Sequence, residues 1–180
     1  MTTAAAGRQA RFEAVMAAVY EPLQRYARRR TSPDVADDVV ADALLVVWRR
    51  LDEIPADAEL PWCYRVAANC LANSRRAAGR RVRLASRVAR LDAPVDVVGP
   101  DLPDPALHAA LATLPEADQE VLRLWAWEDL APAEIAIVLG VTANAVSIRL
   151  HRAKGRLAEA LERMGTDADT DHHEDPEEVT

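Results

Sequence analysis

The sequence contains no apolar run of about 20 residues, the length that a helix needs to cross a bilayer. Its first residues, "MTTAAAGRQARFEAV", have neither the apolar segment nor the cleavage site of a signal peptide. These absences predict a cytoplasmic protein without a membrane partner.

Cysteine and the common catalytic motifs are also scarce. Cys63 and Cys70 are the only two thiols, and no His lies near them in the sequence, which argues against a disulfide framework or a zinc site and predicts buried free thiols. We find no Gly-rich phosphate loop, no nucleophile with an evident base and no cluster with metal-ligand spacing. His172 and His173 lie among acidic residues, where solvation is expected. The sequence therefore predicts no enzymatic activity, no cofactor and no metal.

The charge is unevenly distributed along the chain. The net charge is −7, but residues 1–91 contain 16 basic and 10 acidic residues, whereas residues 165–180 contain seven acidic residues and no Arg or Lys. The overall acidity therefore does not exclude a nucleic-acid partner, because the first half is basic.

Strand-type alternation is nearly absent, and apolar residues recur at helical spacing through most of the chain. The spacing predicts a first helix that buries its apolar stripe, a second from Pro33 to about Arg50, and a third that begins near Pro61. Ser32 is the expected N-cap of the second helix. The residues expected to be buried by the second helix are Val40, Ala43, Leu44, Val47 and Trp48.

Residues 91–105, "LDAPVDVVGPDLPDP", contain four Pro and four Asp and interrupt the helical pattern. We therefore predict an all-α protein of two small helical domains joined by an acidic Pro-rich linker. The expected parts are a helical bundle (8–90), the linker (91–105), a helix-turn-helix domain (106–164) and a disordered acidic tail (165–180).

The stretch "EIAIVLGVTANAVSIRLHRAKGRL" predicts two helices joined by a turn at Gly140 and restarted at Thr142. In the second of these helices, Val146, Leu150, Ala153 and Leu157 fall on the side expected to pack against the preceding helix. The other side carries Asn144, Ser147, Ile148, His151 and Arg152. Such a helix has the shape to enter a DNA major groove, although the same pattern also suits the solvated face of a helical hairpin.

Residues 75–90, "RRAAGRRVRLASRVAR", contain seven Arg and no acidic residue. Arg neutralises phosphates and stacks on unpaired bases, so DNA or RNA is the natural partner, and a solvated basic helix is the alternative. Asn69 and Asn73 lie four residues apart just upstream, where they could contact base edges or play a structural part.

Three stretches together resemble the extracytoplasmic-function (ECF) sigma factors of bacterial RNA polymerase. "DDVVADALLVVWRRL" and "PWCYRVAANCLANSRRA" are similar to patterns in the family's first domain, and "LPEADQEVLRLWAWEDLAPAEIAIVLGVTANAVSIRLHRAKGRL" is similar to its second. The resemblance covers roughly residues 10–163 and includes both halves in the family's order.

The resemblance implies a sigma factor that binds core RNA polymerase, directs it to promoter DNA and promotes opening of the DNA. It places core-polymerase binding on Asp38, Asp42 and Leu45. It places contacts to the minus-ten element on Asn69, Asn73, Arg76 and Arg80, and a pocket for a flipped base at the loop Asp52 to Glu59. It places contacts to the minus-thirty-five element on Ser147, Arg149, His151 and Arg152, to which the helical spacing adds Asn144. An anti-sigma factor is a further expected partner.

Three residues depart from the family pattern: Ala41 stands in place of Gln, Ser147 in place of a frequent basic residue, and Ala131 in place of a Ser or Thr cap. Two other interpretations stay open. One is a stand-alone helix-turn-helix transcription regulator with an N-terminal sensing or dimerisation domain, and the other is a protein-interaction module in which the arginines are incidental.

Overall fold

The computed structural model describes residues 2–88 and 104–170, with side chains for residues 5–81 and 104–165. In these ranges all the regular elements are helices, which confirms the predicted all-α class. The chain divides into two compact units. The first contains α1 (Thr2–Arg28), α2 (Pro33–Arg49), the short 3-10 helix η1 (Leu51–Glu53) and α3 (Glu59–Val88). The second contains α4 (Pro105–Ala112), α5 (Glu116–Ala126), the start of α6 (Pro132–Leu139) and α7 (Ala143–Thr170).

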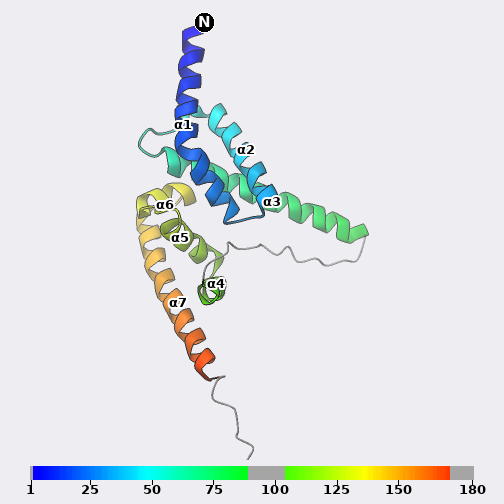
Figure 1. Ribbon diagram of the computed structural model, residues 1–180, viewed down its shortest axis with the longest axis vertical. Helices are drawn as coiled ribbons and strands as arrows, with labels where there is room; N and C mark the ends of the chain where they lie inside the picture. Colours follow the sequence, from blue (N-terminus) through cyan, green and yellow to red (C-terminus); the bar gives the residue numbers. More distant parts are fainter. Residues whose placement is uncertain (1, 89–103, 171–180) are drawn as a thin grey trace, which may run out of the picture. The chain divides into compact units, whose positions relative to one another are not determined.

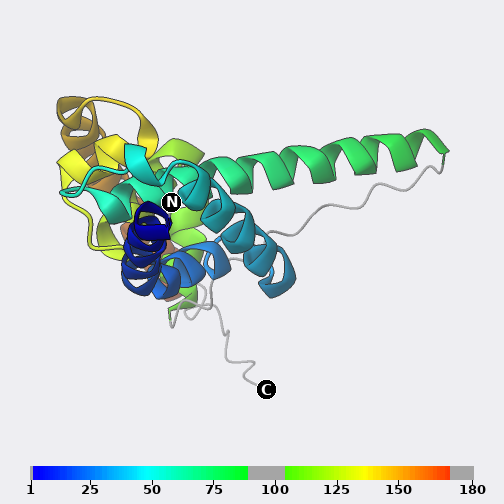
Figure 2. The ribbon, with the colours of Figure 1, turned by 90° about the horizontal axis from the view of Figure 1, so that it is seen from above.

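In the first unit, α1, α2 and α3 all pack against one another (Figure 1). The predicted apolar stripe of α1 is buried at Val15, Val19, Leu23 and Tyr26. These residues lie three or four positions apart and so share one side of the helix. The carboxyl-terminal part of α3 extends beyond α1 and α2 (Figure 2), so its arginine-rich segment leaves the bundle.

The second helix begins and ends close to the predicted residues. Ser32 is the N-cap and Pro33 the first helical residue, although the Ser32 hydroxyl makes no capping hydrogen bond. Val40, Ala43 and Val47 are buried as predicted. The predicted burial of Trp48 is wrong, because its side chain is 40% exposed. One residue corresponds to about 100° of rotation, so Trp48 lies about 100° from Val47 and leaves the buried side.

In the second unit, α7 packs mainly against α4 and α5. Val146, Leu150 and Ala153 form its buried side, as the spacing predicts. The sequence instead predicts that this side packs mainly against the preceding helix, α6, and the structure differs from that prediction. Helices α6 and α7 meet at a bend of 105°, so the eight-residue α6 turns away from the long α7. A buried carboxylate on α5, Asp118, forms an ion pair with Arg156 of α7 and fixes the two helices together.

The ends of the helices are specified by local hydrogen bonds. The Asp104 side chain caps α4 by accepting from the backbone N–H groups of Ala106 and Leu107. The Thr142 hydroxyl caps α7 by accepting from the N–H of Ala145 at 3.2 Å. At Ala131, which lacks a capping side chain, the Glu134 carboxylate accepts from the backbone N–H at 2.8 Å, as in half of a capping box.

The predicted start of the tail at residue 165 differs from the structure, because α7 continues to Thr170. Once a helix is formed, each further residue adds a hydrogen bond at little cost, and so it can extend past the packed segment. Most of the predicted linker and the last ten residues lie outside the described residues. Within the described part, no single helix is both long and apolar enough to cross a membrane; only the bent pair α6 and α7 passes that test jointly.

Candidate nucleic-acid and protein interfaces

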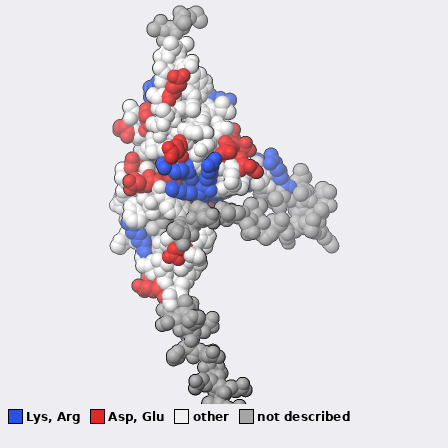
Figure 3. All heavy atoms as spheres, in the orientation of Figure 1, with Lys and Arg blue, Asp and Glu red and all other residues white. Residues whose placement is uncertain are grey.

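The outward side of α2 is acidic and partly apolar. Asp38, Asp42 and Leu45 are all exposed, and the side chain of Leu45 is 53% exposed. At about 100° per residue the three lie within about 60° of one another, opposite the side that carries Ala43 and Val47. Acidic side chains are visible on the surface over the first unit in Figure 3. The structure therefore brings the three predicted residues together on one free surface of the helix.

The two thiols lie on α3 and are free, as predicted. Cys63 is buried, and burial raises the pKa of its thiol to about 12, with Glu59 adding to the shift. Cys70 is half-buried, and burial together with the nearby Asp42 carboxylate raises its pKa as well. A protonated thiol is a poor nucleophile and a poor metal ligand, so the surroundings of neither cysteine activate it. Among the described side chains, no three His, Cys, Asp or Glu group as a metal site requires.

On α3, the structure brings the four residues predicted to contact the minus-ten element onto one exposed side. Asn69, Asn73, Arg76 and Arg80 lie within about 60° of one another around the helix and are all exposed. The Asn73 side-chain carbonyl accepts a hydrogen bond from Arg76, and both side chains are exposed.

Not every arginine near this surface is available to a ligand. Arg75 points to the bundle and donates to the backbone carbonyl of Arg30 at 3.1 Å. Arg30 is itself only 3% exposed, where it stacks on the Tyr26 ring at 3.7 Å and donates to the Tyr26 carbonyl. Within the arginine-rich stretch, Arg75 thus helps to hold the fold, whereas Arg80 and Arg81 are exposed. Its side chains after Arg81 lie outside the described part.

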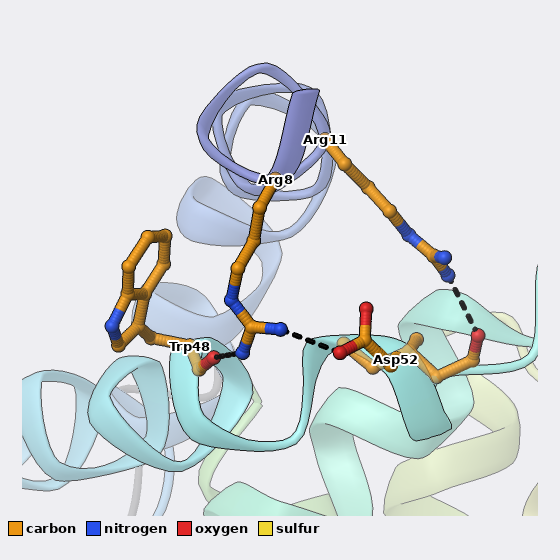
Figure 4. A network of polar contacts seen from close by, with 5 residues as sticks. Arg8, Arg11, Trp48 and Asp52 are labelled. Atoms are coloured by element: carbon orange, nitrogen blue, oxygen red, sulfur yellow. Dashed lines mark hydrogen bonds and ion pairs between the residues drawn. The ribbon is translucent and has the colours of Figure 1, made fainter. Parts of the chain in front are cut away.

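The loop between α2 and α3 is held by two arginines of α1, which the sequence did not predict (Figure 4). Arg8 forms an ion pair with Asp52 and donates to the Trp48 carbonyl at 2.8 Å. Arg11 donates to the Ile54 carbonyl at 3.0 Å. The Trp48 ring meets the edge of Phe12 at a centroid distance of 5.0 Å. The amino-terminal part of α1 therefore fixes the start of the loop Asp52 to Glu59.

On α7, four of the five predicted residues share the outward side. Asn144, Ser147, His151 and Arg152 are exposed, opposite the buried Val146, Leu150 and Ala153. The Ser147 hydroxyl donates to the Ala143 carbonyl at 3.0 Å, so its oxygen can still accept from a ligand.

The fifth residue, Arg149, is exposed but lies about 130° around the helix from the centre of this side. It therefore flanks the outward side rather than belonging to it. Lys154 also flanks this side, and its ammonium lies 3.3 Å from the centre of the Trp125 ring on α5. The outward side of α7 is thus mostly polar, with basic residues along its flanks, which is an arrangement suited to base edges between two phosphate strands.

The family profile described as "Sigma-70, region 4" matches residues 105–157, which contain α4 to α6 and the first half of α7. The chain is 31% identical over 164 residues to the ECF RNA polymerase sigma factor SigL of Mycobacterium tuberculosis, a match that covers 84% of this chain and 92% of SigL. The chain belongs to the ECF sigma factors.

A second relative of this sigma factor is the RNA polymerase sigma-E factor of Streptomyces avermitilis, 34% identical over 161 residues, with 87% of this chain and 88% of the relative covered. Among solved structures, CnrH in complex with the cytosolic domain of CnrY is similar, with 30% identity and a TM-score of 0.59 over 89% of this chain and 94% of CnrH. These matches include both units, so a stand-alone regulator with an unrelated first domain is not favoured.

As an ECF sigma factor, the protein directs RNA polymerase to promoters. Proteins of this kind are regulatory rather than catalytic. The sequence-based prediction of the family and of its general function is therefore confirmed.

Two structural features near the candidate site were not predicted from the sequence. The contacts of Arg8 and Arg11 join positions 40 or more residues apart, for which local spacing carries no signal. The exposure of Trp48 depends on how α1 lies over the end of α2.

Proposed function

We propose that this sigma factor divides its work between its two units, with residues 8–90 binding core RNA polymerase and the minus-ten element and residues 106–164 reading the minus-thirty-five element. The observation that carries the proposal is the presence, in one chain, of an exposed acidic side of α2 and an exposed polar and basic side of α7. Each surface suits a different partner, and neither is needed to hold its own unit together.

The polymerase contact is assigned to Asp38, Asp42 and Leu45. Carboxylates on a protein surface attract a basic partner over about a Debye length, and an exposed leucine adds apolar area that binding removes from water. The departure at Ala41, next to this surface, removes one possible polar contact. Electrostatic and apolar contacts together suit a specific protein interface better than a solvated helix side does.

The minus-ten contact is assigned to Asn69, Asn73, Arg76 and Arg80 of α3, with the loop Asp52 to Glu59 as the pocket for a flipped base. Unstacking a base costs a few kcal/mol, and capture in a pocket or stacking returns about 1 to 3 kcal/mol per base. The sigma factor therefore shifts the equilibrium between closed and open DNA and breaks no bond. No catalytic residue, cofactor or metal is required for this role.

The minus-thirty-five contact is assigned to the outward side of α7. Asn144, Ser147, His151 and Arg152 are placed to meet base edges in the major groove, and Arg149 on the flank is placed to meet a phosphate. This division between base and phosphate contacts follows from the position of each residue around the helix.

We also propose a cytoplasmic location, where promoter DNA and polymerase are found, and an anti-sigma factor as a regulatory partner. CnrH, which is 30% identical to this chain, was solved with the cytosolic domain of CnrY. A regulator that covers the exposed side of α2 or α7 would block the contacts proposed above.

The polymerase contact is tested by reversing its charge. In the variant Asp38→Lys with Asp42→Lys, repulsion replaces attraction at the interface, and we expect binding to purified core polymerase to weaken by at least tenfold, which corresponds to about 1.4 kcal/mol. Both residues are exposed, so the helical circular dichroism should stay normal. Binding is measured by fluorescence anisotropy of the labelled sigma factor.

The matched control is Glu13→Lys, which reverses one exposed charge on α1 of the same unit, where its carboxylate accepts a hydrogen bond from Gln9 at 3.0 Å. This control should bind core polymerase normally. If the double variant binds as tightly as the control, the polymerase contact is misplaced.

A further inference from the structure

Ile148 is an apolar side chain at the centre of a polar helix side. It is 46% exposed, although isoleucine is among the residue types most often buried. On the same side of α7 lie Asn144 and Arg152, one helical turn before and after it. Its apolar surface therefore faces the position at which a bound ligand would lie.

The position of Ile148 cannot be explained by packing within the second unit. The buried side of α7 is formed by Val146, Leu150 and Ala153, and Ile148 lies about 160° from the centre of that side. A β-branched side chain is restricted to few rotamers in a helix, so Ile148 cannot reach back to the buried side. An alanine at this position would have a higher helix propensity and would expose less apolar surface.

The most prominent apolar group that the base edges present in the major groove of DNA is the 5-methyl group of thymine. The other groups in the groove are hydrogen-bond donors and acceptors, for which Asn144, His151 and Arg152 are suited. An aliphatic side chain in the middle of these polar residues is better suited to contact this methyl group than to contact a hydrogen-bond donor or acceptor.

We propose that Ile148 is a specificity-determining residue that contacts the 5-methyl group of a thymine in the upstream promoter element. The inference rests on the proposed function of α7 and adds the chemistry of one base to it. Asn144 and Arg152 then contact bases on either side of this thymine, because they lie one turn before and after Ile148. The upstream element contains a thymine near its centre, on one of its two strands.

The test compares thymine with deoxyuridine, which lacks only the methyl group. The upstream element is first defined by selecting duplexes from a random pool with the holoenzyme, formed from the full chain and core polymerase. Each thymine of the selected element is then replaced singly by deoxyuridine, and competition binding is measured for the unmodified chain and for Ile148→Ala.

We expect one position at which deoxyuridine weakens binding of the unmodified holoenzyme about fourfold, which corresponds to about 0.8 kcal/mol, the transfer free energy of one methylene-sized group. At that position Ile148→Ala should bind thymine and deoxyuridine equally, and Ile148→Val should retain part of the difference. The matched control Val141→Ala truncates another exposed aliphatic side chain, 41% exposed in the turn before α7, and should keep the full difference.

A selected element without thymine, or a deoxyuridine effect of equal size in the unmodified chain and Ile148→Ala, would overturn the inference about Ile148. Holoenzyme that binds matched and scrambled upstream elements equally would instead overturn the proposed upstream reading by α7. The two failures are therefore distinguishable.

Discussion

Residues of one type take different parts in this molecule, according to where each side chain lies. Arg28, Arg29 and Arg30 follow one another, yet Arg30 is buried against Tyr26 whereas Arg28 lies near Asp37 at the surface, with 3.6 Å between the two charged groups. Burial of the Arg30 stem and its cation–π contact stabilise the end of α1. A basic residue therefore contributes to a nucleic-acid surface only if part of its guanidinium stays exposed.

The two arginines of α7 that were assigned to one site are both exposed but differ in their position around the helix. Arg152 lies on the outward side and Arg149 on the flank, so we expect different losses on truncation. Arg152→Ala should cost about 1 to 3 kcal/mol of holoenzyme binding on the matched upstream element and much less on a scrambled one. Arg149→Ala should weaken binding to both sequences equally and reduce the salt dependence.

Holoenzyme binding to matched and scrambled duplexes over a salt series measures both effects, and each variant serves as the control for the other. Both side chains are exposed, so neither change should alter folding. Equal losses on both sequences for Arg152→Ala would make it a phosphate contact, and a sequence-dependent loss for Arg149→Ala would show that α7 enters the groove in a different rotation.

At the scale of the elements, the helices could be predicted from the sequence, but several of the contacts between them could not. The recurrence of apolar residues at three and four positions predicted α1, α2 and the buried side of α7, because burial of one side is what stabilises a short helix. The same periodicity does not specify which helix covers that side. For this reason the partner of α7, the exposure of Trp48 and the contacts of Arg8 and Arg11 required the tertiary structure.

The positions of the candidate site residues could also be predicted in part from the sequence. The outward side of α7 follows from helical geometry, and the structure brings Asn144, Ser147, His151 and Arg152 together there. The assignment of Arg149 came from family resemblance alone, and geometry places it on the flank. The proposed roles of Asp38 and Asp42 also came from family resemblance, because an exposed carboxylate alone does not indicate which partner it binds.

The contact of α1 with the loop after α2 gives an element-scale prediction. Arg11→Ala removes a hydrogen bond to the Ile54 carbonyl, and we expect the first unit to lose about 0.5 to 1.5 kcal/mol of unfolding free energy. The amide hydrogens of residues 51–58 should exchange faster, because the loop start is no longer held. Urea denaturation and amide hydrogen exchange measure the two effects.

The matched control for this prediction is Gln9→Ala, which removes a hydrogen bond to Glu13 of the same helix. It should leave exchange in residues 51–58 unchanged. Unaltered exchange in Arg11→Ala would show that the rest of the fold determines the loop without α1.

At the scale of the whole molecule, the two surfaces that we propose for DNA and the one that we propose for polymerase occur in a single chain with a net charge of −7. The basic side chains are concentrated in residues 1–91, so local charge rather than net charge decides which parts approach DNA. Family membership accounts for this combination, since a sigma factor must contact polymerase and promoter together. Neither unit alone should direct transcription.

Transcription in vitro with purified core RNA polymerase tests this account most directly. We predict that core polymerase with the full chain starts RNA synthesis at a cognate promoter, and that scrambling either the minus-ten or the minus-thirty-five element abolishes it. Core polymerase alone should give no specific transcript. A chain that fails to bind core polymerase, or that gives the same transcription whether or not the two elements are present, would contradict the account.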